Sequence, residues 1–255
     1  MNLSFNYLNF FTENAFIVDM IDSFNKTFIV DNRWLSLLRG LGVTLEITFF
    51  ALLLGIVLGF IVATVRASYD TTIGNKKCKN FGQRILKFFN SICNVYLTVI
   101  RGTPIVIQLM IIYYIIFGSS RNGILAAIIS FGVNSGAYVA EIVRSGIMSI
   151  DRGQMEAGRS LGLNYTQTMI EIIFPQAFKN ILPALGNEFI VLIKETSVAG
   201  YVALQDITYA GNLIRSRTYE AFFPLITVAL VYLAIVMILS YFLKKLERRL
   251  RTSER

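Results

Sequence analysis

The chain contains no histidine among its 255 residues, and only 16% of its residues are charged, against roughly 25% in soluble domains. Without histidine, there is no histidine acid–base catalysis, no Ser/His/Asp or Cys/His nucleophilic site and no histidine-ligated metal. The sequence also lacks the GxxxxGK[ST] phosphate-binding loop, so it shows no means of hydrolysing ATP. Its two cysteines, Cys78 and Cys93, fit neither a disulfide framework nor a metal motif and are interpreted as structural. We therefore expect a protein that is not an enzyme.

What the chain has in excess is apolar character, with 55% hydrophobic residues and a mean hydropathy of +0.59. These values exclude an ordinary water-soluble globule and a disordered chain. The formal net charge of +8 is dispersed along an apolar chain, which favours a membrane protein over a nucleic-acid-binding one. We expect an integral membrane protein without a nucleic-acid partner.

Five apolar segments approach the roughly 20 residues that a helix needs to cross the bilayer core. They are continuous apolar runs, unlike the alternating strands of a membrane barrel. The expected fold class is therefore an all-α integral membrane protein with five transmembrane helices. The fourth segment is the weakest, because Glu188, Lys194 and Glu195 lie inside it, and a soluble helix is its alternative. The five segments are residues 43–65, 95–117, 123–143, 181–201 and 222–243.

Basic residues are distributed unevenly between the connections. With five spans, the 66–87 and 144–180 connections and the tail from Lys244 share one side, which holds sixteen Lys and Arg residues against five on the other. The positive-inside rule then places the N-terminus outside and the C-terminus in the cytoplasm. The chain is expected to divide into three parts: an outer or interfacial segment over 1–36, a transmembrane domain over 37–245 and a basic tail over 246–255. The sequence assigns no function to the first part, and the tail is expected to anchor to anionic headgroups.

Small residues recur in two of the predicted spans. Gly55 and Gly59 form one GxxxG pattern, and Gly132 and Gly136 form another. Each pattern lets two helix backbones approach closely. The sequence is compatible with two roles for these patterns: helix packing within one chain, or an interface between two copies of the chain.

The connection between the third and fourth spans contains a helix–glycine–helix pattern. A first short helix is predicted near residues 154–161, closed at Gly162 by a left-handed residue. A second is predicted to begin at Asn164 as N-cap, with Gln167 as its reciprocal cap. Pro175 then bends or restarts the chain as it enters the next span. The pattern predicts a compact, rigid projection on the cytoplasmic side.

This connection resembles the coupling loop of permease subunits of ATP-binding-cassette importers, which carries Glu-Ala-Ala, three residues, Gly, nine residues and Ile-x-Leu-Pro. Gly158 replaces the second alanine and Phe174 replaces the leucine of that pattern. Segments 101–104, 138–144, 153–154 and 194–197 resemble the polar amino-acid branch of these permeases. The resemblance extends over roughly residues 35–245. The matching positions of the loop are Glu156, Ala157, Gly158, Gly162, Ile172 and Pro175.

The resemblance implies a multi-pass permease subunit of an amino-acid importer in a bacterial cytoplasmic membrane. It implies two cytoplasmic ATPase subunits, a second permease subunit that is identical or paralogous, and an external amino-acid-binding protein. It also implies that ATP and magnesium bind the partner ATPase, that this chain binds no cofactor or metal, and that the six loop residues couple ATPase closure to the spans.

Ionisable residues inside spans cost roughly 2.5 to 3.5 kcal/mol on insertion scales and usually face a cavity or a partner. A zwitterionic amino acid needs both charge signs around it. The candidates for the substrate path are Glu46, Arg101, Glu141, Glu188, Lys194 and Glu195. Structural alternatives stay open: Glu141 and Arg144 stand three residues apart and pair with each other, or Lys194 and Glu195 are solvated near the end of their span.

The second span carries Thr103, Pro104 and Gln108 near its centre. Proline removes a backbone donor and disturbs a helix interior. We expect these residues to break or polarise the span rather than to bind substrate.

Three other classes of protein are alternatives to a permease subunit. A stand-alone secondary transporter usually carries internal repeats and more spans, and the sequence shows no convincing repeat. An intramembrane enzyme needs a catalytic constellation inside the spans. An assembly protein would use the cytoplasmic loop only as a docking site. Uptake measured with and without an ATPase partner separates these classes.

Overall fold

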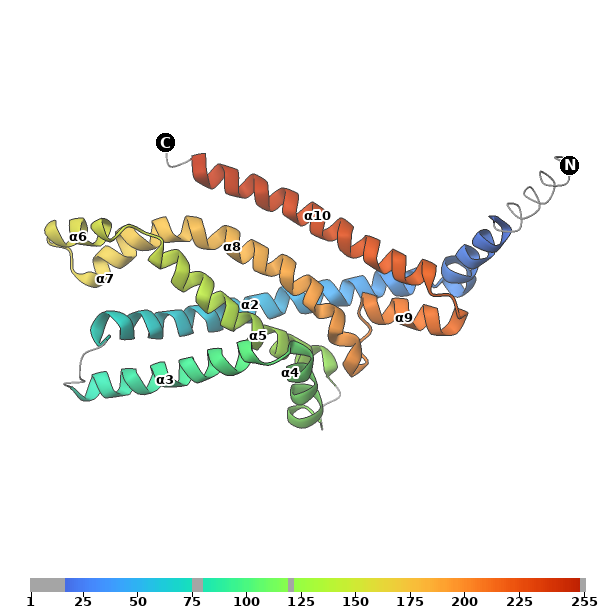
Figure 1. Cartoon of the computed structure of the whole chain (residues 1–255), viewed down its shortest axis with the longest axis horizontal. Helices are drawn as coiled ribbons and strands as arrows, with labels where there is room; N and C mark the ends of the chain where they lie inside the picture. The colour runs from blue at the N-terminus through green and yellow to red at the C-terminus, as the bar shows by residue number, and fades with distance from the viewer. Residues whose placement is uncertain (1–16, 75–79, 119–121, 253–255) are drawn as a thin grey trace, which may run out of the picture. The chain divides into compact units, whose positions relative to one another are not determined.

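The computed structural model describes residues 17–74, 80–118 and 122–252, and these residues form helices and turns without strands (Figure 1). This agrees with the expected all-α fold class. The helices are, in chain order, α2 (Trp34–Thr72), α3 (Phe81–Gly102), α4 (Ile105–Ile111), α5 (Gly123–Met148), α6 (Arg152–Ser160), α7 (Tyr165–Thr168), α8 (Phe174–Glu195), α9 (Ile207–Thr218) and α10 (Phe222–Thr252). Short 3-10 or π turns cover Asn25–Ile29, Val30–Asn32, Ile112–Ile116, Met169–Ile173 and Thr196–Val202.

Three of the described helices, α2, α5 and α10, are long and apolar enough to cross a membrane, and a bent helix pair, α3 with α4, brings the number to as many as four. The predicted fourth span falls on α8 and the turn after it, where its three charged residues lie. It is not among the helices that meet this criterion in the described part of the chain. The count of five spans and the orientation stay predictions.

The described chain divides into two compact units. The residues up to Thr44 together with Ser197–Ile235 form unit 1, and Leu45–Thr196 together with the residues from Val236 form unit 2. Unit 2 contains the six loop residues and all six substrate-path candidates.

In unit 2, the two GxxxG patterns face each other across α2 and α5. A Cβ placed on Gly59 would lie 2.5 Å from Val139 Cγ1, and one on Gly132 would lie 2.7 Å from Leu54 Cδ2. A Cβ on Gly55 would lie 3.1 Å from the Ser135 side chain. The glycines therefore remove the side chains that would keep the two helices apart. Of the two alternatives left open by the sequence, the structure shows packing within the chain.

Alanine in place of a glycine at this contact is expected to lower the stability of the protein, whereas alanine in place of an uncrowded glycine is not. Gly59→Ala should lower the stability of the purified protein by about 1–3 kcal/mol, because it overpacks the contact with α5. Gly42→Ala, in the same helix, meets no atom within 4 Å and should be neutral or stabilising, since alanine is the better helix former. Thermal unfolding in detergent measures both. A rise in melting temperature for Gly59→Ala would contradict the packing argument.

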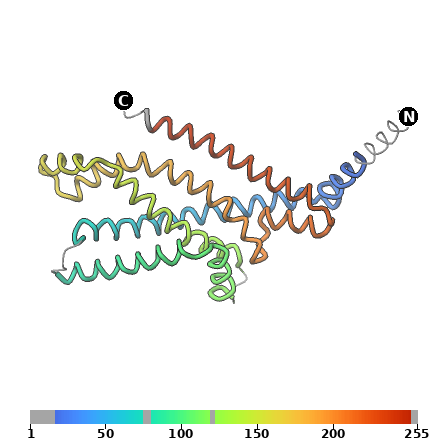
Figure 2. Tube along the Cα trace, in the orientation of Figure 1, coloured from blue at the N-terminus to red at the C-terminus, as the bar shows by residue number. Residues whose placement is uncertain are grey.

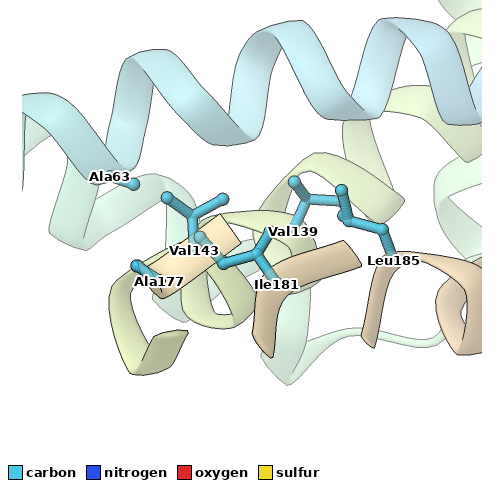
Figure 3. Packing of buried hydrophobic residues seen from close by; sticks show 6 residues of the cluster. All are labelled: Ala63, Val139, Val143, Ala177, Ile181 and Leu185. Carbon is cyan, nitrogen blue, oxygen red and sulfur yellow. The ribbon is translucent and has the colours of Figure 1, made fainter. Parts of the chain in front are cut away.

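The core of unit 2 lies where α2, α5 and α8 meet (Figure 3). Val139 and Val143 from α5 project between Ala63 of α2 and the side chains of α8. Ile181 is fully buried and Leu185 is nearly so. Burial of this aliphatic cluster fixes α8, and hence the segment just before it, against α5.

The segment 95–117, predicted as one span, consists of the end of α3, then α4 and the π turn after it, and the chain changes direction between α3 and α4 (Figure 2). The bent pair, α3 with α4 and the π turn that continues it to Ile116, makes an angle of 110°. The pair is therefore either a broken span or a re-entrant loop. Thr103 is extended, with φ −121° and ψ 145°, because the residue before a proline is disfavoured in the helical region, and Pro104 has no backbone N–H to continue the helix.

Gln108 supplies the hydrogen bonds that the break would leave unmade. Its Nε2 donates to the carbonyl oxygens of Ile100 at 2.8 Å and Thr103 at 3.0 Å, while its Oε1 accepts from Asn134 Nδ2 at 3.0 Å. Non-helical backbone at membrane depth requires such partners. The expectation that these residues break and polarise the segment is confirmed.

In unit 1, the start of α9 is fixed against the first turns of α2. Asp206 caps α9 by accepting hydrogen bonds from the backbone N–H groups of Thr208 and Tyr209, at 3.1 and 2.9 Å. Burial raises the pKa of this carboxyl, and those two hydrogen bonds act in the opposite direction. A Cβ on Gly40 would lie 2.7 Å from the carbonyl oxygen of Asp206, so glycine permits this close approach.

Candidate functional site

The first candidate site is a knob, which we define as residues 151–175, between α5 and α8 (Figure 1). Its first helix, α6, ends in a Schellman motif: Gly162 N–H donates to the Arg159 carbonyl at 3.0 Å, and Leu163 N–H to the Gly158 carbonyl at 3.2 Å. Gly162 has φ +86°, a conformation that glycine adopts without steric cost. The predicted left-handed stop at this residue is confirmed.

The second helix of the knob, α7, begins with the predicted capping box. Asn164 Oδ1 accepts from the Gln167 N–H, and Gln167 Oε1 accepts from the Asn164 N–H, both at 2.9 Å. The chain then passes through the π turn Met169–Ile173 into α8, with Pro175 in the first turn of α8. Proline is favoured there because that position needs no N–H donor. Pro175 thus restarts the chain as helix.

Gly158 is the point at which the two halves of the knob touch. It is buried, and a Cβ on it would lie 2.5 Å from Thr168 Cγ2 and 3.1 Å from Ile172 Cδ1. Gly158, which stands where the family pattern has its second alanine, therefore occupies a packing position at which a side chain would be crowded. The contact holds α6 against the segment that leads into α8, which makes the knob a single packed piece.

The other predicted loop residues face outward. Glu156, Ala157, Gly162 and Pro175 are exposed, while Ile172 is half-buried. Beside them Leu161 is 80% exposed. A charged and apolar mixture on a rigid exposed surface suits a partner protein. The structure brings Gly158 and Ile172 together inside the knob and leaves the outer residues unpartnered within the described chain.

The second candidate site is a group of charged residues in unit 2. Glu141 on α5 pairs with Arg66 of α2 at 3.5 Å and with Arg101 of α3 at 3.4 Å. The Arg101 guanidinium also lies 5.7 Å from the centre of the Tyr138 ring, within reach of a cation–π interaction. Two arginines and one glutamate leave an excess positive charge on this cluster of three helices.

The alternative that Glu141 pairs with Arg144 is wrong. Arg144 pairs with Asp70 of α2 at 3.5 Å, and Glu141 with the two other arginines. Partners on neighbouring helices take precedence here over the residue three positions along the same helix.

Glu188 lies apart from this cluster, inside the packing of α5 and α8. It is 7% exposed and accepts a hydrogen bond from Ser135 Oγ at 2.8 Å. A buried carboxyl with a single hydroxyl partner is costly at membrane depth. Glu188 therefore remains a candidate residue of the substrate path.

The remaining candidates do not join a common site within the described residues. Glu46 and Lys194 are exposed, and Glu195 is half-buried. Of the six, only Arg101 and Glu141 contact each other. Sequence reasoning did not name Arg66, Tyr138 or Ser135 as site residues. Two of them carried a local signal: Tyr138 begins the 138–144 segment that resembles the family, and Ser135 lies between the glycines of the second GxxxG pattern.

An all-helical chain with several membrane-length apolar helices, charged residues among them and a rigid knob between two helices has the features of the transmembrane subunit of a transporter. The family described as "Binding-protein-dependent transport system inner membrane component" matches residues 81–252. The chain belongs to this family.

Individual relatives cover most of the chain. The chain is 36% identical over 219 residues to the glutamine transport system permease protein GlnP of Escherichia coli strain K12. The matched region covers 84% of this chain and 93% of that protein. The chain is 35% identical over 221 residues to the arginine transport system permease protein ArtQ of Bacillus subtilis strain 168, with 86% and 94% covered. The crystal structure of an amino acid ABC transporter with histidines matches with a TM-score of 0.75 and 36% identity, over 87% and 98% of the two chains.

These findings confirm the main functional prediction from the sequence. The chain is a permease subunit of an ATP-binding-cassette importer and a multi-pass protein of the cytoplasmic membrane. It works with an ATPase, which is a separate subunit, and with a substrate-binding protein, and it is not itself an enzyme. The stand-alone transporter, the intramembrane enzyme and the assembly protein are set aside.

Proposed function

We propose that this permease carries a polar amino acid into the cell, with the N-terminus outside, five spans and the C-terminus in the cytoplasm. The names of the glutamine and arginine permeases that resemble it support this class of substrate. The uneven distribution of Lys and Arg supports the orientation. In this arrangement the knob lies on the cytoplasmic side.

The knob docks in the ATPase subunit and passes its nucleotide-driven closure to the spans. The single observation that carries this proposal is the rigid, exposed knob joined to α8 without an intervening loop. Glu156, Ala157, Gly162 and Pro175 form its outer surface, and Gly158 with Ile172 holds it together. A two-state partner must contact the knob differently in its two states, or no force is transmitted.

The proposed assembly contains two ATPase subunits, two permease subunits and one external amino-acid-binding protein. The second permease is a copy of this chain or a paralogue. ATP and magnesium bind the ATPase subunits, and this chain binds neither cofactor nor metal. The substrate path includes the charged residues Arg101, Glu141, Glu188, Lys194, Glu46 and Glu195.

Uptake into proteoliposomes tests this proposal. We expect the chain, reconstituted with its ATPase and with the binding protein outside, to accumulate radiolabelled glutamine or arginine against a gradient only when ATP is enclosed. Omitting the ATPase should abolish accumulation, because this chain has no phosphate-binding loop. Accumulation by the permease alone, or a knob that is accessible to membrane-impermeant reagents from outside intact cells, would refute it.

A further inference from the structure

One side of α3, in unit 2, carries a continuous row of polar side chains. Its members follow one another at intervals of four, three, four and three residues, which places all of them on one side of a helix with 3.6 residues per turn. All of them are exposed. This row, which we call the polar stripe, consists of Lys87, Ser91, Asn94, Thr98 and Arg101.

The side of α3 directly next to the polar stripe is apolar. Its residues each follow a stripe residue in sequence, and each is exposed. They are Phe88, Ile92, Val95 and Val99. The exposed surface of α3 thus has an apolar face that suits lipid acyl chains and a polar face that is unfavourable against them.

The middle of the polar stripe lies level with membrane-spanning parts of two neighbouring helices. Cys93, next to Asn94 in the chain, packs in one buried cluster with Val62 of α2 and Ala140 of α5. Val62 and Ala140 belong to the apolar runs 43–65 and 123–143, on helices that are long and apolar enough to cross a membrane. Asn94 therefore lies at the depth of the bilayer core.

Asn94 is the stripe residue that most needs a polar neighbour. Ser91 and Thr98 donate their hydroxyl hydrogens within α3, to the Lys87 carbonyl at 3.0 Å and to the Asn94 carbonyl at 2.8 Å. No described residue makes a hydrogen bond with the side-chain amide of Asn94. An amide without a hydrogen-bond partner is costly in an apolar medium, so water or a polar partner must lie against this face.

Direct packing against α3 of a second copy of the chain does not suit the polar stripe. A two-fold axis along the membrane normal would bring each residue beside its equivalent in the other copy. Lys87 would then meet Lys87 and Arg101 would meet Arg101, and like charges brought together repel. Water suits the whole stripe, because it solvates the cations at its ends and hydrogen-bonds the amide at its centre.

We propose that the polar stripe lines the water-filled exit path of the transported amino acid, and that Asn94 and Thr98 contact it on its way to the cytoplasm. The proposal rests on the transport function and orientation proposed above, which place the Lys87 end of α3 on the cytoplasmic side. Arg101 belongs both to the stripe and to the ion pair with Glu141, so the stripe continues from a pair that is already a candidate for the path. An amide donates and accepts hydrogen bonds. Asn94 therefore suits either charged group of an amino acid without holding it by a full charge.

Thiol labelling of the transporter assembled with its ATPase in proteoliposomes tests whether this face is in water. Single cysteines replace Asn94, Thr98, Val95 or Val99 in a chain whose two native cysteines are alanine. A charged methanethiosulfonate reagent is present on both sides of the membrane and reacts with the thiolate, which forms in water and not among acyl chains. Val95→Cys and Val99→Cys are the matched controls, because each lies one residue along at nearly the same depth, on the apolar face.

We expect Asn94→Cys and Thr98→Cys to react more than about tenfold faster than the two controls. In ATP-driven uptake of radiolabelled glutamine or arginine, Asn94→Leu should lower the rate about tenfold, since the passing substrate loses a hydrogen bond. Asn94→Gln keeps the amide and should retain most of the uptake. Val95→Leu, on the apolar face, should transport like the unmodified protein.

Three results would overturn the proposal. The first is equal labelling of the polar and apolar positions. The second is oxidative cross-linking of Asn94→Cys into a permease dimer without labelling, which would show that a second copy covers the stripe. The third is fast labelling with normal uptake by Asn94→Leu, which would show a wet face that the substrate does not use.

The labelling rates do not depend on which solute is carried. If the unmodified transporter accumulates neither amino acid, the proposed substrate class is refuted. The comparison of Asn94→Cys and Thr98→Cys with their controls still decides whether the polar stripe is in water.

Discussion

Gly158→Ala is expected to lower ATP-driven uptake about tenfold while leaving the protein inserted in the membrane. The added Cβ would lie 2.5 Å from Thr168 Cγ2, closer than real side chains approach. Either Thr168 must turn and lose its hydrogen bond to the Asn164 carbonyl, or α6 must move away from α7. Overpacking of this kind costs about 1–3 kcal/mol. The knob then no longer holds its surface rigidly against the ATPase, and hydrolysis becomes uncoupled from transport. Parallel assays of uptake and of ATP hydrolysis in the assembled transporter measure this.

A second substitution separates crowding from every other effect of the alanine. Thr168→Ser removes the Cγ2 atom and keeps the hydroxyl that donates to the Asn164 carbonyl at 3.0 Å. The double variant Gly158→Ala/Thr168→Ser should therefore recover most of the uptake, and Thr168→Ser alone should be close to unmodified protein. If the double variant is as defective as Gly158→Ala, the packing explanation is wrong. If Gly158→Ala transports normally, the knob does not transmit the force.

The knob was predictable from the sequence because its determinants are local. The left-handed Gly162 and the Asn164–Gln167 capping box each act within a few residues, so their spacing along the chain is also their spacing in space. The start of the first helix was placed two residues late, since Asp151 provides the N-cap. The crowding at Gly158 was not predictable, because it depends on how two helices close against each other.

The charged cluster shows why the rest of the site could not be predicted. Arg66, Arg101 and Glu141 lie on three helices, and their contact depends on the registers of those helices, which the sequence does not encode locally. Proximity in sequence suggested Arg144 as the partner of Glu141 instead. The break at Pro104, by contrast, was expected, because a proline is a local signal. The angle of 110° that the break makes was not predictable, because it depends on how α4 packs.

Glu188→Gln is expected to raise the substrate concentration for half-maximal uptake by ten- to a hundredfold, with little change in basal ATP hydrolysis. Glutamine keeps the shape of the side chain and its hydrogen bond with Ser135, which is 2.8 Å long, but not the negative charge. If Glu188 meets the ammonium group of the passing amino acid, the lost charge-assisted hydrogen bond is worth about 1.5–3 kcal/mol. Initial rates of radiolabelled uptake over a range of substrate concentrations measure it.

Two controls distinguish a role in the path from a role in packing. Ser135→Ala removes the hydrogen bond but leaves the carboxylate in place, so its effect on apparent affinity should be much smaller than that of Glu188→Gln. Glu195→Gln neutralises the other acidic path candidate on the same helix, a half-buried carboxyl seven residues along, and shows whether a loss of apparent affinity is particular to Glu188. If Ser135→Ala impairs uptake as much as Glu188→Gln does, the pair serves to hold α5 against α8. If Glu188→Gln leaves the apparent affinity unchanged, Glu188 does not contact the substrate. The two arginines that pair with Glu141 are then the stronger candidates, as a binding site for the carboxylate of the substrate.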